Sequence, residues 1–190
     1  MTRWIENRLQ RSSWLGFLIW FAGLMGYSFW AFMADTPWTR ALEAAGGKLP
    51  EMQPNFPGDE PAQSISALRE AGAIPDYLMW QVLDFPYAAL NLLATATAMA
   101  LGLRALKLGA GPARYLLLLP LLYFAAETIE NALLALYAGA GVGGALTGVQ
   151  QGATAVKFAA GNASLLLGLV ALIIAAVVAA VSFFKRRGAG

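Results

Sequence analysis

The chain has 190 residues, of which 58% are hydrophobic and 13% are charged, whereas soluble proteins average about 45–50% and about 25%. Its net charge is +2, but the basic residues lie at the ends of apolar runs and form no patch or stripe, so we exclude nucleic acid as a partner. The absence of cysteine and histidine excludes disulfides, thiolate chemistry and histidine-ligated haem or zinc, and we expect no cofactor and no metal site.

Four apolar segments are long enough to cross a bilayer, which requires about 20 residues each. We place them at about 13–33, 77–103, 115–137 and 154–184. The first follows a basic start, but its apolar stretch is longer than the roughly 7–15 residues of a signal peptide core, so we interpret it as an uncleaved helix. The sequence therefore predicts an all-α fold, a polytopic four-helix transmembrane bundle that forms a single membrane domain, 1–190.

The segment between the first two spans, 34–76, is too long to be a plain connector. Its first half is rich in proline and glycine, and a short helix is predicted at 61–70, with Gly72 after its end. We therefore expect a partly ordered outer loop that contains a short helix and covers one end of the bundle. A loop without a role is the alternative.

Basic residues are distributed unequally along the chain. The outer loop holds seven acids and three basic residues, and the link 138–152 has no charge. The arm before the first span, the link between the second and third spans, and the tail hold nine basic residues and one acid, Glu6. By the positive-inside rule, we expect both termini on the cytoplasmic side of a bacterial inner membrane. The nine are Arg3, Arg8, Arg11, Arg104, Lys107, Arg114, Lys185, Arg186 and Arg187.

Small residues recur where membrane helices can touch. Ala160, Ser164 and Gly168 are spaced by four residues in the last span, and Gly23 and Gly26 lie in the first. Spacing of this kind permits close helix contact in lipid. We expect both sets to mark helix–helix contacts.

Ionisable residues inside apolar spans are costly, so they normally face the interior of the bundle, a partner or water. The second span carries Asp84, Tyr87 and Asn91 on one helical stripe. The third carries a second stripe, and Asn162 lies in the fourth. Counting along the helices predicts a polar funnel in the outer half of the bundle, with Lys157 above the level of the carboxyl groups. The second stripe consists of Tyr123, Glu127, Glu130 and Asn131.

Residues of the first span and a proline also bear on this funnel. Tyr27 and Ser28 are close enough along the first span to reach it, and Pro86 follows Asp84 by two residues. A proline inside a helix frees a backbone carbonyl and kinks the axis, which would widen the funnel, although tolerated curvature without a role is the alternative.

The predicted ligand-binding residues belong to these stripes. Glu127 is the best candidate for a proton-transfer role, but whether any reaction is catalysed stays open. The alternative is that the carboxyl and amide groups bond to one another and hold the helices together. The ligand-binding set is Asp84, Tyr87, Asn91, Tyr123, Glu127, Glu130, Asn131 and Asn162.

The chain resembles a family of uncharacterised bacterial inner-membrane proteins. The similar features are Tyr77 before the second span, Asp84-Phe85-Pro86-Tyr87 within it, and Glu127-Thr128-Ile129-Glu130-Asn131 in the third. The similarity covers roughly 54–131 and departs at 71–75, where the family tends to carry Leu-Gly and Gly-Arg patterns. The resemblance implies a four-helix fold and no activity.

Two functions remain open from the sequence. The first is a pocket in the outer half of the bundle for a lipid-like or amphipathic small molecule, with the polar group among the acids and the tail between helices. The second is an accessory or assembly subunit, bound to a membrane protein partner or to a second copy of the chain, with no ligand chemistry. We disfavour a transporter because the inner half of every span is apolar.

Overall fold

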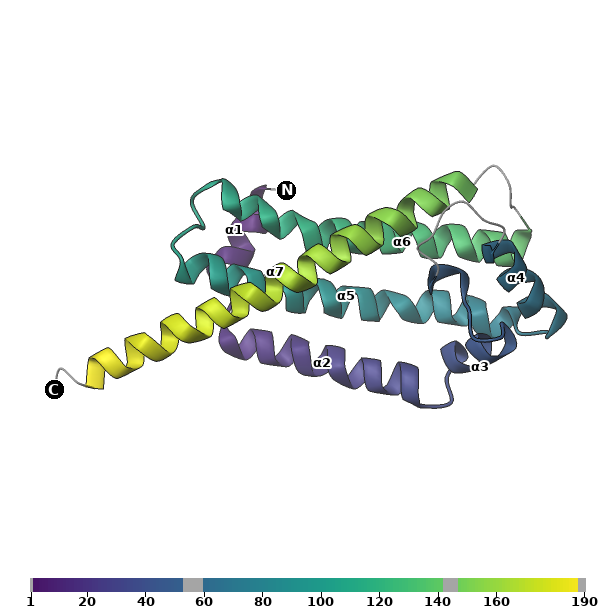
Figure 1. The fold of residues 1–190 in the computed structure, drawn as a ribbon, viewed down its shortest axis with the longest axis horizontal. Coiled ribbons are helices and arrows are strands. Elements are labelled where there is room, and N and C mark those ends of the chain that lie inside the picture. Colours follow the sequence, from purple (N-terminus) through teal and green to yellow (C-terminus); the bar gives the residue numbers. More distant parts are fainter. Residues whose placement is uncertain (1, 53–59, 142–146, 188–190) are drawn as a thin grey trace.

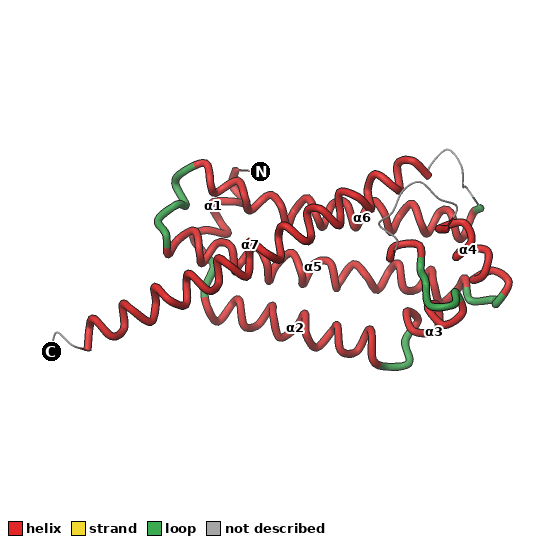
Figure 2. The backbone as a smooth tube through the Cα atoms, in the orientation of Figure 1, coloured by secondary structure: helices red, strands yellow, loops and turns green. Residues whose placement is uncertain are grey.

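The computed structural model describes residues 2–52, 60–141 and 147–187, and the regular structure in these ranges is entirely helical (Figures 1 and 2). Four stretches are long and apolar enough to cross a membrane. The prediction of an all-α, multi-pass membrane bundle is confirmed. The spans are α2 (Trp14–Met33), α5 (Ile74–Ala105), α6 (Leu118–Ala140) with the short helix η2 (Pro112–Leu117) before it, and α7 (Thr147–Arg187).

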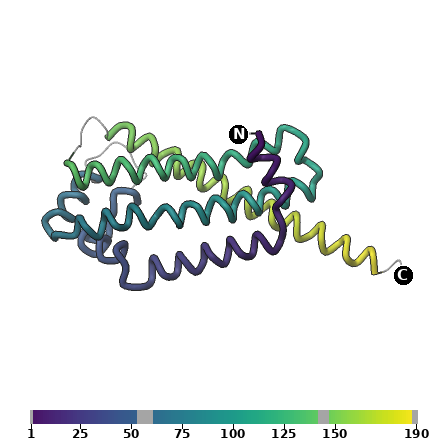
Figure 3. The backbone as a smooth tube through the Cα atoms, turned by 180° about the vertical axis from the view of Figure 1, so that it is seen from behind, coloured from purple at the N-terminus to yellow at the C-terminus, as the bar shows by residue number. Residues whose placement is uncertain are grey.

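Helix α5 forms the centre of the bundle. It packs against α2, α6 and α7, and α6 also packs along α7 (Figures 1 and 3). Every residue from 94 to 103 is buried, and most of them are alanine, threonine or glycine. Small side chains let neighbouring helices approach closely, which is how helices gain packing energy in lipid. By contrast, α2 buries only Phe17 and Ala31 and presents most of its surface outward.

Small residues let α7 pack closely against its neighbours. Ala160, Ser164 and Gly168 are all buried, so their prediction as contact positions is confirmed. One turn after Gly168 in α7, Ala171 meets Gly102 of α5. A Cβ added to Gly102 would be 2.5 Å from Cβ of Ala171 and 2.6 Å from its carbonyl oxygen. Only glycine fits at that position.

The two glycines of α2 differ from each other. A Cβ on Gly23 would meet Leu90 of α5 at 3.2 Å, so Gly23 does mark a helix contact. A Cβ on Gly26 would meet no atom within 4 Å among the described residues. The prediction for Gly26 is therefore wrong, because the helix turns this position away from α5.

One end of the bundle, which we call the α1 end, carries both termini (Figure 1). The amphipathic helix α1 (Thr2–Arg11) buries Ile5 against Leu103 and Leu117. Arg104 donates a 2.6 Å hydrogen bond to the carbonyl of Ser12, which ties the arm to α5. The sequence did not predict this helix.

The opposite end, the loop end, is covered by the segment between α2 and α5. It contains α3 (Pro37–Ala44), η1 (Pro50–Met52) and α4 (Glu60–Glu70). Thr36 and Thr39 cap the start of α3 reciprocally. The short helix predicted at 61–70 is confirmed as α4, whereas α3 was not predicted, and 53–59 lie outside the described residues. Buried Leu49 and Leu68 join Tyr77 in one apolar cluster, so the described part of the loop is packed onto the bundle.

Helix α7 is longer than predicted, with 41 residues. At 1.5 Å per residue it measures roughly 60 Å, about twice the thickness of a bilayer core. It crosses the bundle obliquely, and its final turns extend beyond the other helices at the α1 end (Figure 1). Residues 176–187 are all exposed.

Candidate functional site

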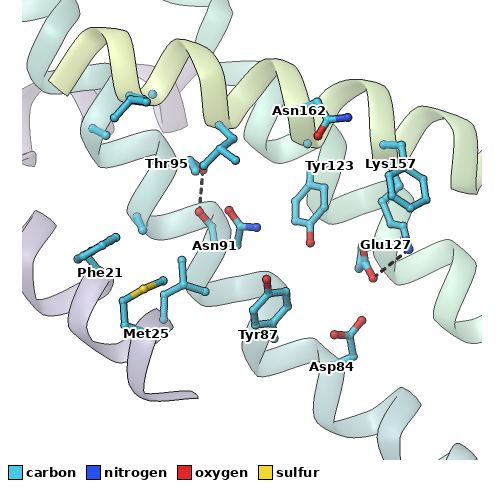
Figure 4. A pocket seen from close by; sticks show the side chains of 18 of the residues that line it. Phe21, Met25, Asp84, Tyr87, Asn91, Thr95, Tyr123, Glu127, Lys157 and Asn162 are labelled. Carbon is cyan, nitrogen blue, oxygen red and sulfur yellow. Dashed lines mark hydrogen bonds and ion pairs between the residues drawn. The ribbon is translucent and has the colours of Figure 1, made fainter. Parts of the chain in front are cut away.

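A cavity of about 680 Å³ lies among α2, α5, α6 and α7 and reaches α3 and η1 at the loop end. Its size is within the range of roughly 300–1,000 Å³ that is typical of small-molecule sites. Figure 4 shows its polar side chains grouped on α5, α6 and α7, while Phe21 and Met25 of α2 lie on the apolar side. The cavity is therefore polar at one end and apolar along the rest.

The apolar part extends toward the α1 end. Phe17 and Phe21 of α2 form one wall, and the buried Ala98 forms the floor. Along α7, Leu165 is 65% exposed, so its side chain stands at the edge of the cavity. The remaining apolar lining residues in this part are Leu24, Met25, Ala94, Gly168, Leu169 and Leu172.

Lys157 is the centre of the charged cluster. Its ammonium forms an ion pair with Glu130, lies 3.6 Å from Oε1 of Glu127 and donates a 3.2 Å hydrogen bond to the carbonyl of Glu51. Only 7% of Lys157 is exposed. Removing a lysine from water is costly unless opposite charges and acceptors surround it, and this cluster supplies both.

The carboxyl groups of α5 and α6 meet beside this lysine. Asn131 donates a 2.9 Å hydrogen bond to Oδ2 of Asp84. Figure 4 shows the Asp84 and Glu127 side chains pointing toward each other, and the two groups interact. The stripes that the sequence predicted on separate helices therefore face one another.

Two of the predicted ligand-binding residues lie behind the cavity. Glu130 is 0% exposed and Asn131 is 2% exposed, and neither lines the cavity wall. Glu130 accepts a hydrogen bond from Thr154, which itself accepts one from Gln150 at 2.8 Å. This part of the predicted site supports the positions of other side chains.

The other predicted residues do line the cavity. Tyr87, Asn91, Tyr123 and Asn162 are all on its wall, and Asn162 is exposed. The ring of Tyr123 packs across Gly161, where an added Cβ would be 3.0 Å from Cδ2 of the ring. A glycine at this point of α7 is what lets the tyrosine lie flat against the helix.

The first span contributes one direct bond. The Tyr27 hydroxyl donates to the carbonyl of Leu83, in the turn of α5 that precedes Pro86. Pro86 has no N–H to donate to the carbonyl of Val82, four residues earlier, so the helical ladder is weakened in the turn that Tyr27 binds. Ser28 instead donates to the carbonyl of Leu24 in its own helix, at 2.7 Å.

The structure differs from the sequence prediction for Lys157. It was expected above the level of the carboxyl groups, whereas it pairs with two of them. A depth counted back along α7 from Lys185 holds only if this residue marks the edge of the bundle. Because the last turns of α7 extend beyond the bundle, the count moved every upstream residue too far toward the loop end (Figure 1).

The sequence prediction also missed Glu51 of η1. Its side chain is 8% exposed, it lines the cavity, and Oε2 accepts a 2.9 Å hydrogen bond from the Tyr77 hydroxyl. Burial raises the pKa of Glu51 from an ordinary 4.5 to about 7. Its only sequence signal was an acid placed among Leu49, Pro50 and Met52.

Comparison of the chain with protein-family models, with curated proteins and with solved structures found no match. The chemistry of the cavity wall is therefore the basis for inferring a function.

Proposed function

We propose that the protein binds an amphipathic, lipid-like small molecule in this cavity. The observation that supports the proposal is the polarity of the wall, because charged groups lie at one end and apolar side chains along the rest. A molecule with one polar group and one hydrocarbon tail matches that arrangement. Its polar group would lie beside Asp84 and Glu127, and its tail between α2, α5 and α7.

The location that fits this proposal is a bacterial inner membrane with both termini cytoplasmic. In that orientation the α1 end, which carries Arg8 and Arg104, faces the negatively charged cytoplasmic lipids. The polar end of the cavity would then open toward the outer leaflet.

Proton transfer is a narrower form of the same proposal. Glu127 is the group best placed for it, because it lines the cavity and lies 3.6 Å from the ammonium of Lys157, with the Asp84 side chain pointing toward it (Figure 4). A carboxyl held between an acid and a base can exchange a proton with a ligand at the same position. Binding alone does not require this step.

Native mass spectrometry of gently extracted protein tests the proposal. We expect the wild type to carry an adduct of lipid-like mass, and Leu165→Trp to lose it, because the larger ring enters the cavity at its edge. Leu166→Trp is the matched control, since Leu166 is 63% exposed but does not line the cavity.

Two results would contradict the proposal. One is an adduct that both tryptophan variants retain, which would locate the lipid on the outer surface. The other is a spectrum without any adduct but with a second polypeptide, which would favour the assembly-subunit function.

A further inference from the structure

Aromatic rings gather at the loop end of the cavity. Phe32 of α2 packs against Trp38 of α3 with ring centroids 4.8 Å apart and against Tyr87 of α5 at 5.7 Å. Trp38 also packs against Trp80 of α5 at 6.2 Å. All four rings line the cavity, so their faces and edges form part of its wall. We call these four residues the aromatic box.

Asp84 lies on α5 between two residues of this box. It follows Trp80 by four residues and precedes Tyr87 by three, so the three side chains share one face of the helix. It is 6% exposed and lines the same cavity. A carboxylate that lines a cavity together with aromatic rings can bind an ammonium group there, because both the charge and the negative ring faces attract a cation.

The one lysine at this end of the cavity is not free to bind an anion. An ammonium has three N–H donors. Lys157 already faces three acceptors, which are Glu130, Glu127 and the carbonyl of Glu51. A negatively charged head group would have to displace one of these acceptors and would then meet the remaining carboxylates.

The described wall of the cavity carries more carboxyl groups than ammonium groups. Among the described residues, three carboxyl groups line the cavity, on Glu51, Asp84 and Glu127, with a single ammonium beside them. Oε1 of Glu51 is buried and has no hydrogen-bond partner among the described residues. The wall therefore includes an acidic side chain with an acceptor that no described residue satisfies.

We propose that the head group that this cavity selects is an ammonium, held by Asp84 within the aromatic box, with its hydrocarbon tail in the apolar part of the cavity. This inference rests on the proposed amphipath-binding function and specifies its ligand class. The same chemistry is offered by a free long-chain amine and by a phospholipid that carries an ethanolamine.

Ligands with identical tails and different head groups test the inference. The purified protein in an uncharged detergent is titrated with dodecylamine, dodecanol and dodecanoic acid, and binding is followed by intrinsic tryptophan fluorescence. We expect the amine to bind about tenfold more tightly than the alcohol, and the acid to bind most weakly. Lauroyl lysophosphatidylethanolamine and lauroyl lysophosphatidylglycerol form a second pair with the same tail and different head groups. If lysophosphatidylethanolamine binds more tightly than dodecylamine, the source of the ammonium is a phospholipid, and if dodecylamine binds more tightly, the source is a free amine.

Variants locate the selectivity. Asp84→Asn keeps the shape of the side chain and an acceptor for Asn131, and it should reduce the preference for amine over alcohol to less than about threefold. Trp38→Leu should weaken amine binding, whereas Trp30→Leu should not, because Trp30 does not line the cavity. The probes differ in how strongly they partition into micelles. Comparison of each variant with the wild type, probe by probe, cancels this difference.

Equal binding of amine, alcohol and acid would overturn the ammonium inference and leave the amphipath-binding function standing. An amine preference that Asp84→Asn does not reduce would also overturn the inference. Failure of every probe to bind would contradict the proposed function itself, and the inference with it.

Discussion

At the scale of single residues, Lys157 and Glu130 form the most deeply buried ion pair of the cluster, with 9% and 0% of their side chains exposed. Breaking a buried pair leaves an uncompensated charge, whereas removing both charges together often costs little. The pair therefore predicts a non-additive response to mutation.

Lys157→Met is expected to lower the free energy of unfolding by about 3–5 kcal/mol, because it leaves the carboxyl groups without their cation. The double variant Lys157→Met/Glu130→Gln should recover at least half of that loss. Unfolding in mixed micelles measures both. If the losses caused by Lys157→Met alone and Glu130→Gln alone add up to the loss in the double variant, the pair is not coupled.

Glu51 gives a prediction about pH. Its pKa is raised in the folded protein to about 7, so between its ordinary value and about 7 the folded state holds a proton that the unfolded chain releases. Stability from this group is therefore greatest at low pH and falls as the pH rises through that window.

Glu51→Gln removes this titration and keeps an acceptor for Tyr77. The melting temperature of the variant should therefore rise relative to that of the wild type as the pH goes from about 5 to about 8. Thermal unfolding of the two proteins at a series of pH values measures the difference. A constant difference across the range would contradict the burial of an ionisable Glu51.

Part of the site was predictable from single residues, because helical spacing alone aligns Asp84, Tyr87 and Asn91 on one face. Glu51 was not predictable, because a loop residue has no periodicity to show which way it points. It was not predictable either that Glu127 lines the cavity while Glu130 lies behind it. Both lie on the same stripe, and only the packing of α7 decides which of them faces the cavity.

At the scale of helices, the contact of α5 with α7 depends on Gly102. An added methyl group would be within 2.6 Å of both the side chain and the backbone of Ala171, so the helices would have to move apart. Backbone displacement of this kind costs about 1–3 kcal/mol.

We therefore expect Gly102→Ala to lower the free energy of unfolding by about that amount, as measured in mixed micelles. Gly26→Ala is the matched control, since its methyl group would meet nothing within 4 Å among the described residues and alanine favours the helix. Equal stability of the two variants would contradict the close crossing.

The four spans were predictable at this scale because each is a long apolar run, and their ends were correct to within a few residues except for α7. Helices α1 and α3 were missed. Both are short. Helix α3 depends on the local caps of Thr36 and Thr39 and on packing against the bundle, and no hydrophobic run in the sequence predicts either feature.

At the scale of the whole molecule, the loop end and the two spans that carry the acids form one unit. The segment between α2 and α5 places Trp38 and Glu51 on the wall of a cavity whose other polar residues come from three spans. Helix α2 buries little of its own surface and completes the remaining side. The cavity therefore exists only in the assembled bundle, and no single span contains it.

The proposed function requires that an amphipathic molecule occupies the space between α2, α5 and α7. A fatty alcohol with a diazirine in its tail tests this claim independently of head-group charge. After irradiation in membranes and peptide mapping, we predict labels concentrated on cavity-lining residues such as Phe21 and Leu169. Labels spread equally over outward-facing positions such as Leu18 and Leu166, which do not line the cavity, would contradict the account.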